Sequence, residues 1–241
     1  MTASLFVEVR KLKGSLALTL SLVAPTLIAT FLGLLCLRHR VMTWPEAMEG
    51  TTGLWSFFVM PMAITALATL MAQIEHGPRA WDHILSLPVP RWRLFAAKSI
   101  VIVTVVGLMS VVLGLEIRLV DVLLRAFAAE HAPTGPFPWT YAIRTLGGMW
   151  AASFFLTMIQ LWVSLRFSSF VPGLTLGIAG TFIAVMASAL PEGVYVPWMM
   201  PLNILSADAV RATIALRLGI LGGGLTLLAM IIHLGRKEMM A

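Results

Sequence analysis

The chain has 241 residues, of which 59% are hydrophobic and only 12% are charged, and its mean hydropathy is +0.92. These values lie far outside the range of soluble globular domains and indicate an integral membrane protein. The net charge of +6 does not indicate nucleic-acid binding, because the basic residues are scattered at the ends of apolar stretches. The single cysteine, Cys36, excludes an internal disulfide and a cysteine-based metal site.

The chain begins with a short amphipathic segment, residues 1–14. Leu5, Val9 and Leu12 recur there at helical spacing, against charged residues at positions 8, 10, 11 and 13. This pattern predicts a helix that lies in the membrane interface and leads into the first span like an elbow. The apolar run that follows is too long for a signal-peptide core and lacks a small-residue cleavage site, so we interpret it as a retained span.

Six apolar stretches reach the roughly 20 residues needed to cross a bilayer. They cover residues 15–37, 51–73, 97–115, 141–165, 170–190 and 213–234. We therefore predict an all-α integral membrane protein with six transmembrane helices, which form a single transmembrane domain over residues 1–241.

An even number of spans places both termini on the same side of the membrane. If that side is the cytoplasm, ten of the 17 lysines and arginines lie inside, as the positive-inside rule favours. Arg38 and Arg40 lie outside and count against this orientation. We predict a multi-pass protein of the bacterial cytoplasmic (inner) membrane with both termini in the cytoplasm.

Two outer segments are unusual. Residues 117–130 alternate charged and apolar side chains, which predicts that the third span continues outward as an amphipathic helix until prolines break the chain. Residues 191–212 are rich in proline and aromatic residues and are apolar for a water-exposed loop, so a path that re-enters the membrane is one explanation.

The largest predicted cytoplasmic segment, residues 75–96, joins the second and third spans. Pro78 suits the first turn of a helix, and Trp81, Ile84 and Leu85 then fall on one face of it. Pro88 and Pro90 end the helix. This short amphipathic helix is typical of a membrane protein that is acted on by a soluble partner.

Signatures of chemistry within the membrane are lacking, and no metal site is predicted. The sequence contains no His-Glu-x-x-His, no Gly-x-Ser-x-Gly and no Walker motif, so any nucleotide hydrolysis must occur on a partner. His76 and His83 are seven residues apart, but an exposed polar helix face explains them better than a metal site. Gln160, within the fourth span, is a candidate for a substrate path, and an interhelical hydrogen bond is the alternative.

The joining segment resembles the coupling segment of ATP-binding-cassette (ABC) permeases of the type-2 exporter family. Its combination of Glu-His, a tryptophan and Leu-x-Leu-Pro-Val is similar to the lantibiotic-immunity and bacitracin-export permeases. Pro90 departs from the family, where serine or threonine commonly precedes the arginine. The residues that carry the resemblance are Glu75, His76, Trp81, Leu85, Ser86, Leu87, Pro88, Val89, Arg91, Ala97 and Lys98.

The resemblance implies a permease subunit without enzymatic activity or cofactor of its own. Two such chains, identical or related, would bind two cytoplasmic ABC ATPase subunits, which hold ATP and magnesium. The coupling helix would dock through apolar anchors and rim charges, and an amphipathic cargo would be exported: an antimicrobial peptide, a lipid-like molecule or a hydrophobic small molecule. The implied coupling residues are Glu75, His76, Arg79, Trp81, Ile84, Leu85, Leu87, Pro88 and Arg91, with Glu75, Arg79 and Arg91 as the rim charges.

Two other classes remain as alternatives. A secondary transporter or channel would place charged groups near the membrane midplane, where this sequence has few. A membrane-embedded enzyme would rely on scattered polar groups: Glu116, His131, Arg144 and Glu192.

Overall fold

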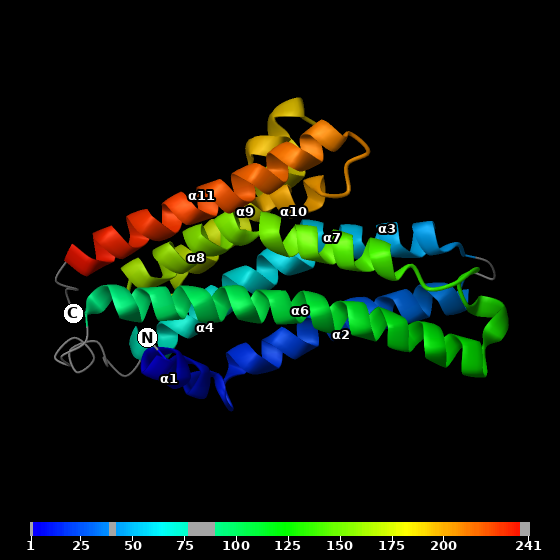
Figure 1. Ribbon diagram of the computed structural model, residues 1–241, viewed down its shortest axis with the longest axis horizontal. Helices are drawn as coiled ribbons and strands as arrows, with labels where there is room; N and C mark the ends of the chain where they lie inside the picture. The colour runs from blue at the N-terminus through cyan, green and yellow to red at the C-terminus, as the bar shows by residue number, and fades with distance from the viewer. Residues whose placement is uncertain (1, 39–41, 77–89, 237–241) are drawn as a thin grey trace.

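The computed structural model describes residues 2–38, 42–76 and 90–236, and this part of the chain is helical, with no strand (Figure 1). The prediction of an all-α membrane protein is confirmed. The α-helices are α1 (Thr2–Leu12), α2 (Leu16–Arg38), α3 (Trp44–Leu54), α4 (Met60–His76), α6 (Arg91–Phe127), α7 (Trp139–Ala152), α8 (Phe154–Arg166), α9 (Val171–Ala187), α10 (Met200–Asn203) and α11 (Ala209–Arg236). Short π and 3-10 turns connect some of them: η1 (Trp55–Val59), η2 (Ala129–His131), η3 (Pro191–Tyr195) and η4 (Pro197–Met199).

Within the described residues, five helical stretches are long and apolar enough to cross a membrane: Leu16–Arg38, Trp44–His76, Arg91–Phe127, Trp139–Arg166 and Ala209–Gly235. The predicted span over residues 170–190 corresponds to α9, which has only 17 residues. It is shorter because Leu190 is extended and Pro191 starts the next turn. A proline disfavours helical geometry at the residue that precedes it. The crossing of the membrane by α9, and so the total of six spans, stays a prediction.

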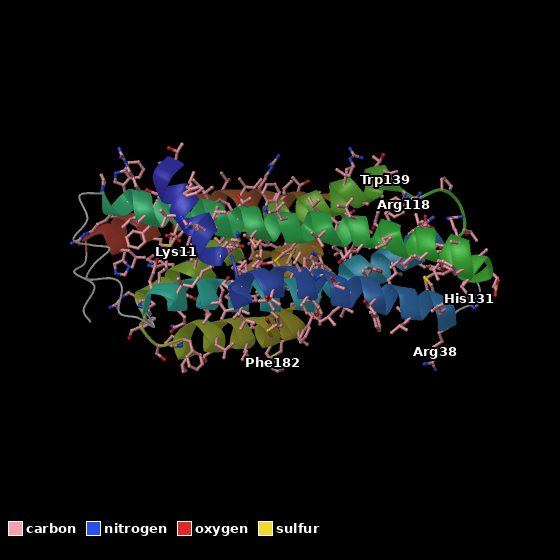
Figure 2. The ribbon with its side chains drawn as sticks, turned by 90° about the horizontal axis from the view of Figure 1, so that it is seen from below. Lys11, Arg38, Arg118, His131, Trp139 and Phe182 are labelled. Atoms are coloured by element: carbon pink, nitrogen blue, oxygen red, sulfur yellow. The ribbon has the colours of Figure 1, made fainter. Side chains whose placement is uncertain are left out.

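The bundle has two distinct ends. Figure 2 shows Lys11 toward one end and Arg38 and His131 at the opposite end. We call the end that holds α1, His76 and Arg91 the proximal end, and the opposite one the distal end.

The second long helix is interrupted in its middle. The turn η1 is a π-helix, in which the backbone N–H of Met60 donates to the carbonyl of Trp55. Pro61 follows directly, and a proline lacks the N–H that a regular helix would use at that point. The interruption divides the predicted span into α3 and α4.

The predicted span over residues 141–165 consists of two helices rather than one. α7 and α8 meet at Ser153, whose hydroxyl donates to the carbonyl of Trp150 at 2.7 Å. At the same place α11 packs backbone to backbone, since a Cβ on Gly219 would lie 2.5 Å from the carbonyl oxygen of Ala152. Only glycine allows this approach, as is common between membrane helices.

The longest helix is α6, whose 37 residues give it a length of roughly 55 Å, well beyond the ~30 Å hydrocarbon core. At its distal end Asp121 is buried and pairs with Arg118 and Arg125. Arg125 also donates to the carbonyls of Pro133 and Gly135, at 3.0 and 2.8 Å. These contacts tie the connection between α6 and α7 to α6 itself.

The segment that follows α9 folds back onto the bundle. Its turns η3, η4 and α10 contact α7, α9 and α11 (Figure 1). Trp198, Met199 and Met200 are buried there. The segment is therefore part of the packed core.

Candidate functional site

Three helices meet at the proximal end of the molecule: α1, α4 and α6. Two of them, α4 and α6, flank the predicted coupling segment in the sequence. The C-terminal end of α4 and the N-terminal end of α6 lie next to each other, and α1 packs against α6. Four charged side chains fill this junction: Glu8 and Lys11 from α1, Glu75 from α4 and Lys98 from α6. We call them the ion-pair cluster.

Each ammonium group of the ion-pair cluster contacts both carboxylates. Lys11 Nζ lies 2.7 Å from Glu8 and 2.7 Å from Glu75, while Lys98 Nζ lies 2.7 Å from Glu8 and 2.6 Å from Glu75. The two positive and two negative charges balance, so the cluster has no formal net charge. Glu75 is 1% exposed and Lys98 is 2% exposed. A buried charge is costly unless it is paired, so Glu75 and Lys98 depend on the opposite charges that they contact.

The ion pairs shift the pKa values of the two members on α1. Burial disfavours the Glu8 carboxylate, but the charges of Lys98 and Lys11 and their hydrogen bonds outweigh burial and lower the pKa of Glu8. Burial likewise opposes the Lys11 ammonium, yet hydrogen bonds from it to Glu75 and Glu8 raise the pKa of Lys11. Both residues are therefore charged at neutral pH.

The structure places Glu75 differently from the sequence interpretation. The resemblance assigns Glu75 to the rim of an ATPase contact, but the side chain is buried inside this chain and bonded to two lysines. His76 is the last residue of α4 and Arg91 is the first residue of α6, so both lie where the coupling segment joins its spans. The other predicted coupling residues lie outside the described residues: Arg79, Trp81, Ile84, Leu85, Leu87 and Pro88.

Sequence reasoning did not predict the pairing of Glu8, Lys11 and Lys98 with Glu75, although a signal was present. Glu8 lies three residues after Leu5 and four before Leu12, so it belongs to the stripe that these apolar residues form. Glu75 continues the buried positions of Met71 and Ala72 in the same way. A single charged residue within an apolar helical stripe indicates that it pairs with an opposite charge inside the protein. The sequence alone does not show which residue that partner is.

Two polar residues that the sequence analysis names, Gln160 and Glu116, have partners inside the chain. Gln160 is fully buried, and its amide nitrogen donates to the carbonyl of Gly173 at 2.8 Å, which joins α8 to α9. Glu116 accepts a hydrogen bond from Thr26 at 2.6 Å, which joins α6 to α2. The interhelical hydrogen bond is therefore the better interpretation of Gln160.

The comparisons with known proteins identify the family. Residues 4–184, about three quarters of the chain, match the family model described as ABC-2 family transporter protein. The chain belongs to the ABC-2 transporter family. The matched region of this ABC-2 chain includes most of α1, the helices from α2 to α8 and most of α9, and thus the whole ion-pair cluster. No curated protein and no solved structure matches the chain.

Membership in the ABC-2 family makes the chain a membrane permease component of an ABC transporter, and so a transport component rather than an enzyme. In residues 2–38, 42–76 and 90–236, no three histidine, cysteine, aspartate or glutamate side chains are arranged to hold a metal ion.

Replacing Lys98 by methionine tests the ion-pair cluster of this ABC-2 permease. The variant leaves two buried carboxylates with Lys11 as their only cation, so we expect the free energy of unfolding to fall by about 3 kcal/mol. Thermal unfolding of the purified chain in detergent measures this loss. Lys13→Met is the matched control, because Lys13 is exposed and takes no part in the four ion pairs. Equal effects of the two variants would show that the cluster does not stabilise the fold.

The lowered pKa of Glu8 predicts an acid-dependent loss of stability. A carboxylate with a lowered folded pKa contributes fully above its unfolded value near 4.5, and the contribution disappears as pH falls through the lower folded value. We expect the unfolding temperature of Glu8→Gln to depend less on pH between about 5 and 3 than that of the parent chain. Parallel pH profiles of the two chains would contradict this role of Glu8.

The buried amide of Gln160 predicts a structural effect. Gln160→Leu removes the hydrogen bond to Gly173, so we expect a loss of about 1 kcal/mol of stability and unchanged transport per folded molecule. Gln73→Leu is the control, since Gln73 also donates to a backbone carbonyl, that of Ser168, but outside the core. A changed cargo preference at unchanged stability would instead place Gln160 in the substrate path.

Proposed function

We propose that this ABC-2 permease is an exporter subunit, driven by a cytoplasmic ATPase that docks on the coupling segment over residues 75–96. The observation that carries the proposal is the position of the ion-pair cluster. It joins the last turn of α4 and the first turns of α6, so it holds together the two spans that enter and leave this segment. It also bonds both spans to α1.

This arrangement supports a mechanical role for the ion-pair cluster. A force applied to residues 77–89 by a partner reaches α4 and α6 first, because these helices flank the segment. Since Glu75 and Lys98 are bonded to each other, the helix ends would move together and would carry α1 with them. In the proposed cycle, ATP binding on the partner closes the ATPase dimer and tilts these spans.

The assembly we propose has two permease chains, identical or related, and two ATPase subunits on the cytoplasmic side. The cargo would be amphipathic: an antimicrobial peptide, a lipid-like molecule or a hydrophobic small molecule, moved outward. The low share of charged residues, 12%, supports an apolar path along the membrane rather than a hydrophilic pore. Both termini would lie in the cytoplasm with the proximal end.

Substitutions in the coupling segment test the docking. We expect Trp81→Ala and Leu85→Asp each to abolish co-purification of the ATPase, because apolar anchors at the centre of an interface contribute at least about 2 kcal/mol each. Membrane insertion and thermal stability should be unchanged. Phe127→Ala is the control, since this aromatic side chain is exposed and ends α6 at the distal end.

The charge-balanced variant Glu75→Gln/Lys98→Met separates docking from transmission. It leaves the Glu8–Lys11 pair intact and should retain the bound ATPase, while ATP hydrolysis no longer drives transport. ATPase binding that survives both coupling-segment substitutions would overturn the docking role. A chain that purifies alone and transports along an ion gradient would favour the channel or secondary-transporter alternative.

A further inference from the structure

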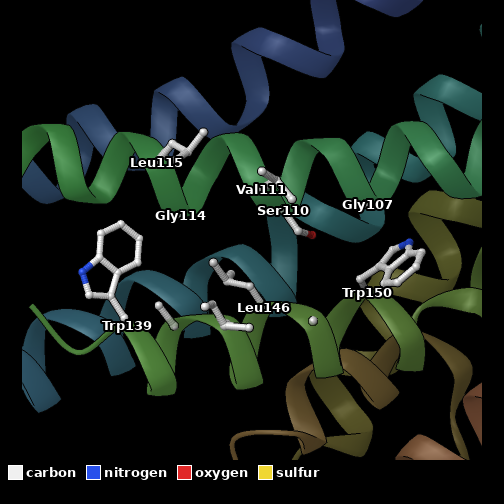
Figure 3. Close-up of a pocket in the computed structure, with 11 residues that line it drawn as sticks. Gly107, Ser110, Val111, Gly114, Leu115, Trp139, Leu146 and Trp150 are labelled. Carbon is white, nitrogen blue, oxygen red and sulfur yellow. The ribbon is translucent and has the colours of Figure 1, made fainter.

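A narrow apolar groove runs between α6 and α7, far from the ion-pair cluster. Its volume is about 240 Å³ (Figure 3). The wall on α6 includes Gly107, Ser110 and Gly114, and the wall on α7 includes Leu146 and Gly147. Both helices belong to segments that are long and apolar enough to cross a membrane, so the medium that reaches this groove is hydrocarbon rather than water.

Two tryptophans bound the groove. Trp139 and Trp150 lie near its opposite ends in Figure 3, and their separation of 11 residues on α7 corresponds to roughly 16 Å. The indole of Trp150 is fixed, because its Nε1 donates to the carbonyl of Val103 on α6 at 2.9 Å. The indole of Trp139 packs against Phe137, with ring centroids 4.7 Å apart. The groove is therefore a slot with an aromatic ring at each end, which suits a chain-like molecule.

The inside of the slot offers few polar groups. The hydroxyl of Ser110 donates to the carbonyl of Val106 in its own helix, at 3.3 Å, so this donor is already used. Gly147 borders open space, since a Cβ at this position would have no neighbour within 4 Å. A larger side chain there would extend into the slot. A hydrocarbon chain fits such a lining, whereas a polar molecule would lose hydrogen bonds there.

Arg118 places a positive charge at the distal end of the slot. Arg118 lies on the same face of α6 as Gly107 and Gly114, one turn beyond the latter. Its guanidinium lies 5.7 Å from the centre of the Phe137 ring and pairs with Asp121. Since Asp121 also pairs with Arg125, two cations share one anion and one positive charge remains. The side chain of Arg118 is 37% exposed and so accessible to a ligand.

We propose that this groove binds an anionic phospholipid of the surrounding bilayer. One acyl chain lies in the slot between Trp139 and Trp150, and the phosphate lies at Arg118. The apolar lining favours the acyl chain, while the net positive charge of Arg118, Asp121 and Arg125 favours the anionic headgroup. The inference does not depend on the proposed export cycle, because it requires only that α6 and α7 lie in a membrane.

Photo-labelling of the full chain in phosphatidylcholine nanodiscs tests the proposal. The probe is phosphatidylglycerol with a diazirine on one acyl chain, and mass spectrometry maps the labelled peptides. We expect labels to concentrate on residues 107–115 and 139–150, and Gly147→Leu to reduce them about tenfold because it fills the slot. Gly224→Leu is the matched control, since a Cβ there also has no neighbour within 4 Å but lies on α11.

A second variant tests the headgroup contact. With Arg118→Gln, Asp121 still pairs with Arg125, so the fold should persist, and the preference for the phosphatidylglycerol probe over a phosphatidylcholine probe should fall about fivefold. An unchanged preference would overturn the role of Arg118. Labels spread evenly over all exposed apolar helix faces, or unaffected by Gly147→Leu, would overturn the groove as a lipid site. Labelling that requires ATP turnover would identify a cargo in place of a bilayer lipid.

Discussion

The high cost of burying an unpaired charge is the constraint on which the proximal end of this molecule depends. Glu75 and Lys98 are almost inaccessible to solvent, so their charges are tolerated only because each contacts two groups of opposite sign. The pairing fixes three chain segments relative to one another: the N-terminal helix, the end of α4 and the start of α6. Separating α4 from α6 would break the pair of Glu75 and Lys98, and moving α1 away would break the pairs that Lys11 and Glu8 make with Glu75 and Lys98.

A similar rule governs the rest of the spans, with weaker interactions. Polar side chains within the helices mostly bond to the carbonyl four residues earlier, as Thr52 and Thr65 do at 2.6 and 2.9 Å. Gln160 and Glu116 instead bond across helices. Such groups hold neighbouring spans together where the hydrophobic effect cannot, because lipid is as apolar as the side chains.

Charge is concentrated at two levels of the bundle. The ion-pair cluster lies at the proximal end, and Arg118, Asp121 and Arg125 lie toward the distal end of α6. The 17 residues of α6 between Lys98 and Glu116 carry no charge. The proximal charges balance one another inside the protein, whereas the distal set keeps one positive charge near the apolar groove. The two levels therefore differ in charge balance: the proximal cluster has no formal net charge, whereas Arg118 in the distal set is partly exposed.

Much of the architecture could be predicted from the sequence, since hydropathy and helical periodicity depend on residues close together in the chain. The all-α membrane class and the short amphipathic helix at the N-terminus follow from such local patterns. The break at Ser153 was not predicted, because it depends on the approach of α11 through Gly219. The short length of α9 was also missed, although Pro191 marks its end in the sequence.

The candidate site shows the same division. The sequence by itself determined that the chain is a membrane protein, that residues 75–96 form an exceptional polar segment between two spans, and that this segment resembles an ATPase-coupling element. Only the tertiary structure decided that Glu8 pairs with Lys98, 90 residues away, and that Glu75 is buried instead of lying on a rim. It also decided that Gln160 bonds to α9 and that α6 and α7 enclose a groove. The physical reason is that a helical pattern shows which face of a helix is buried, while the partner of a buried charge depends on which helices pack together.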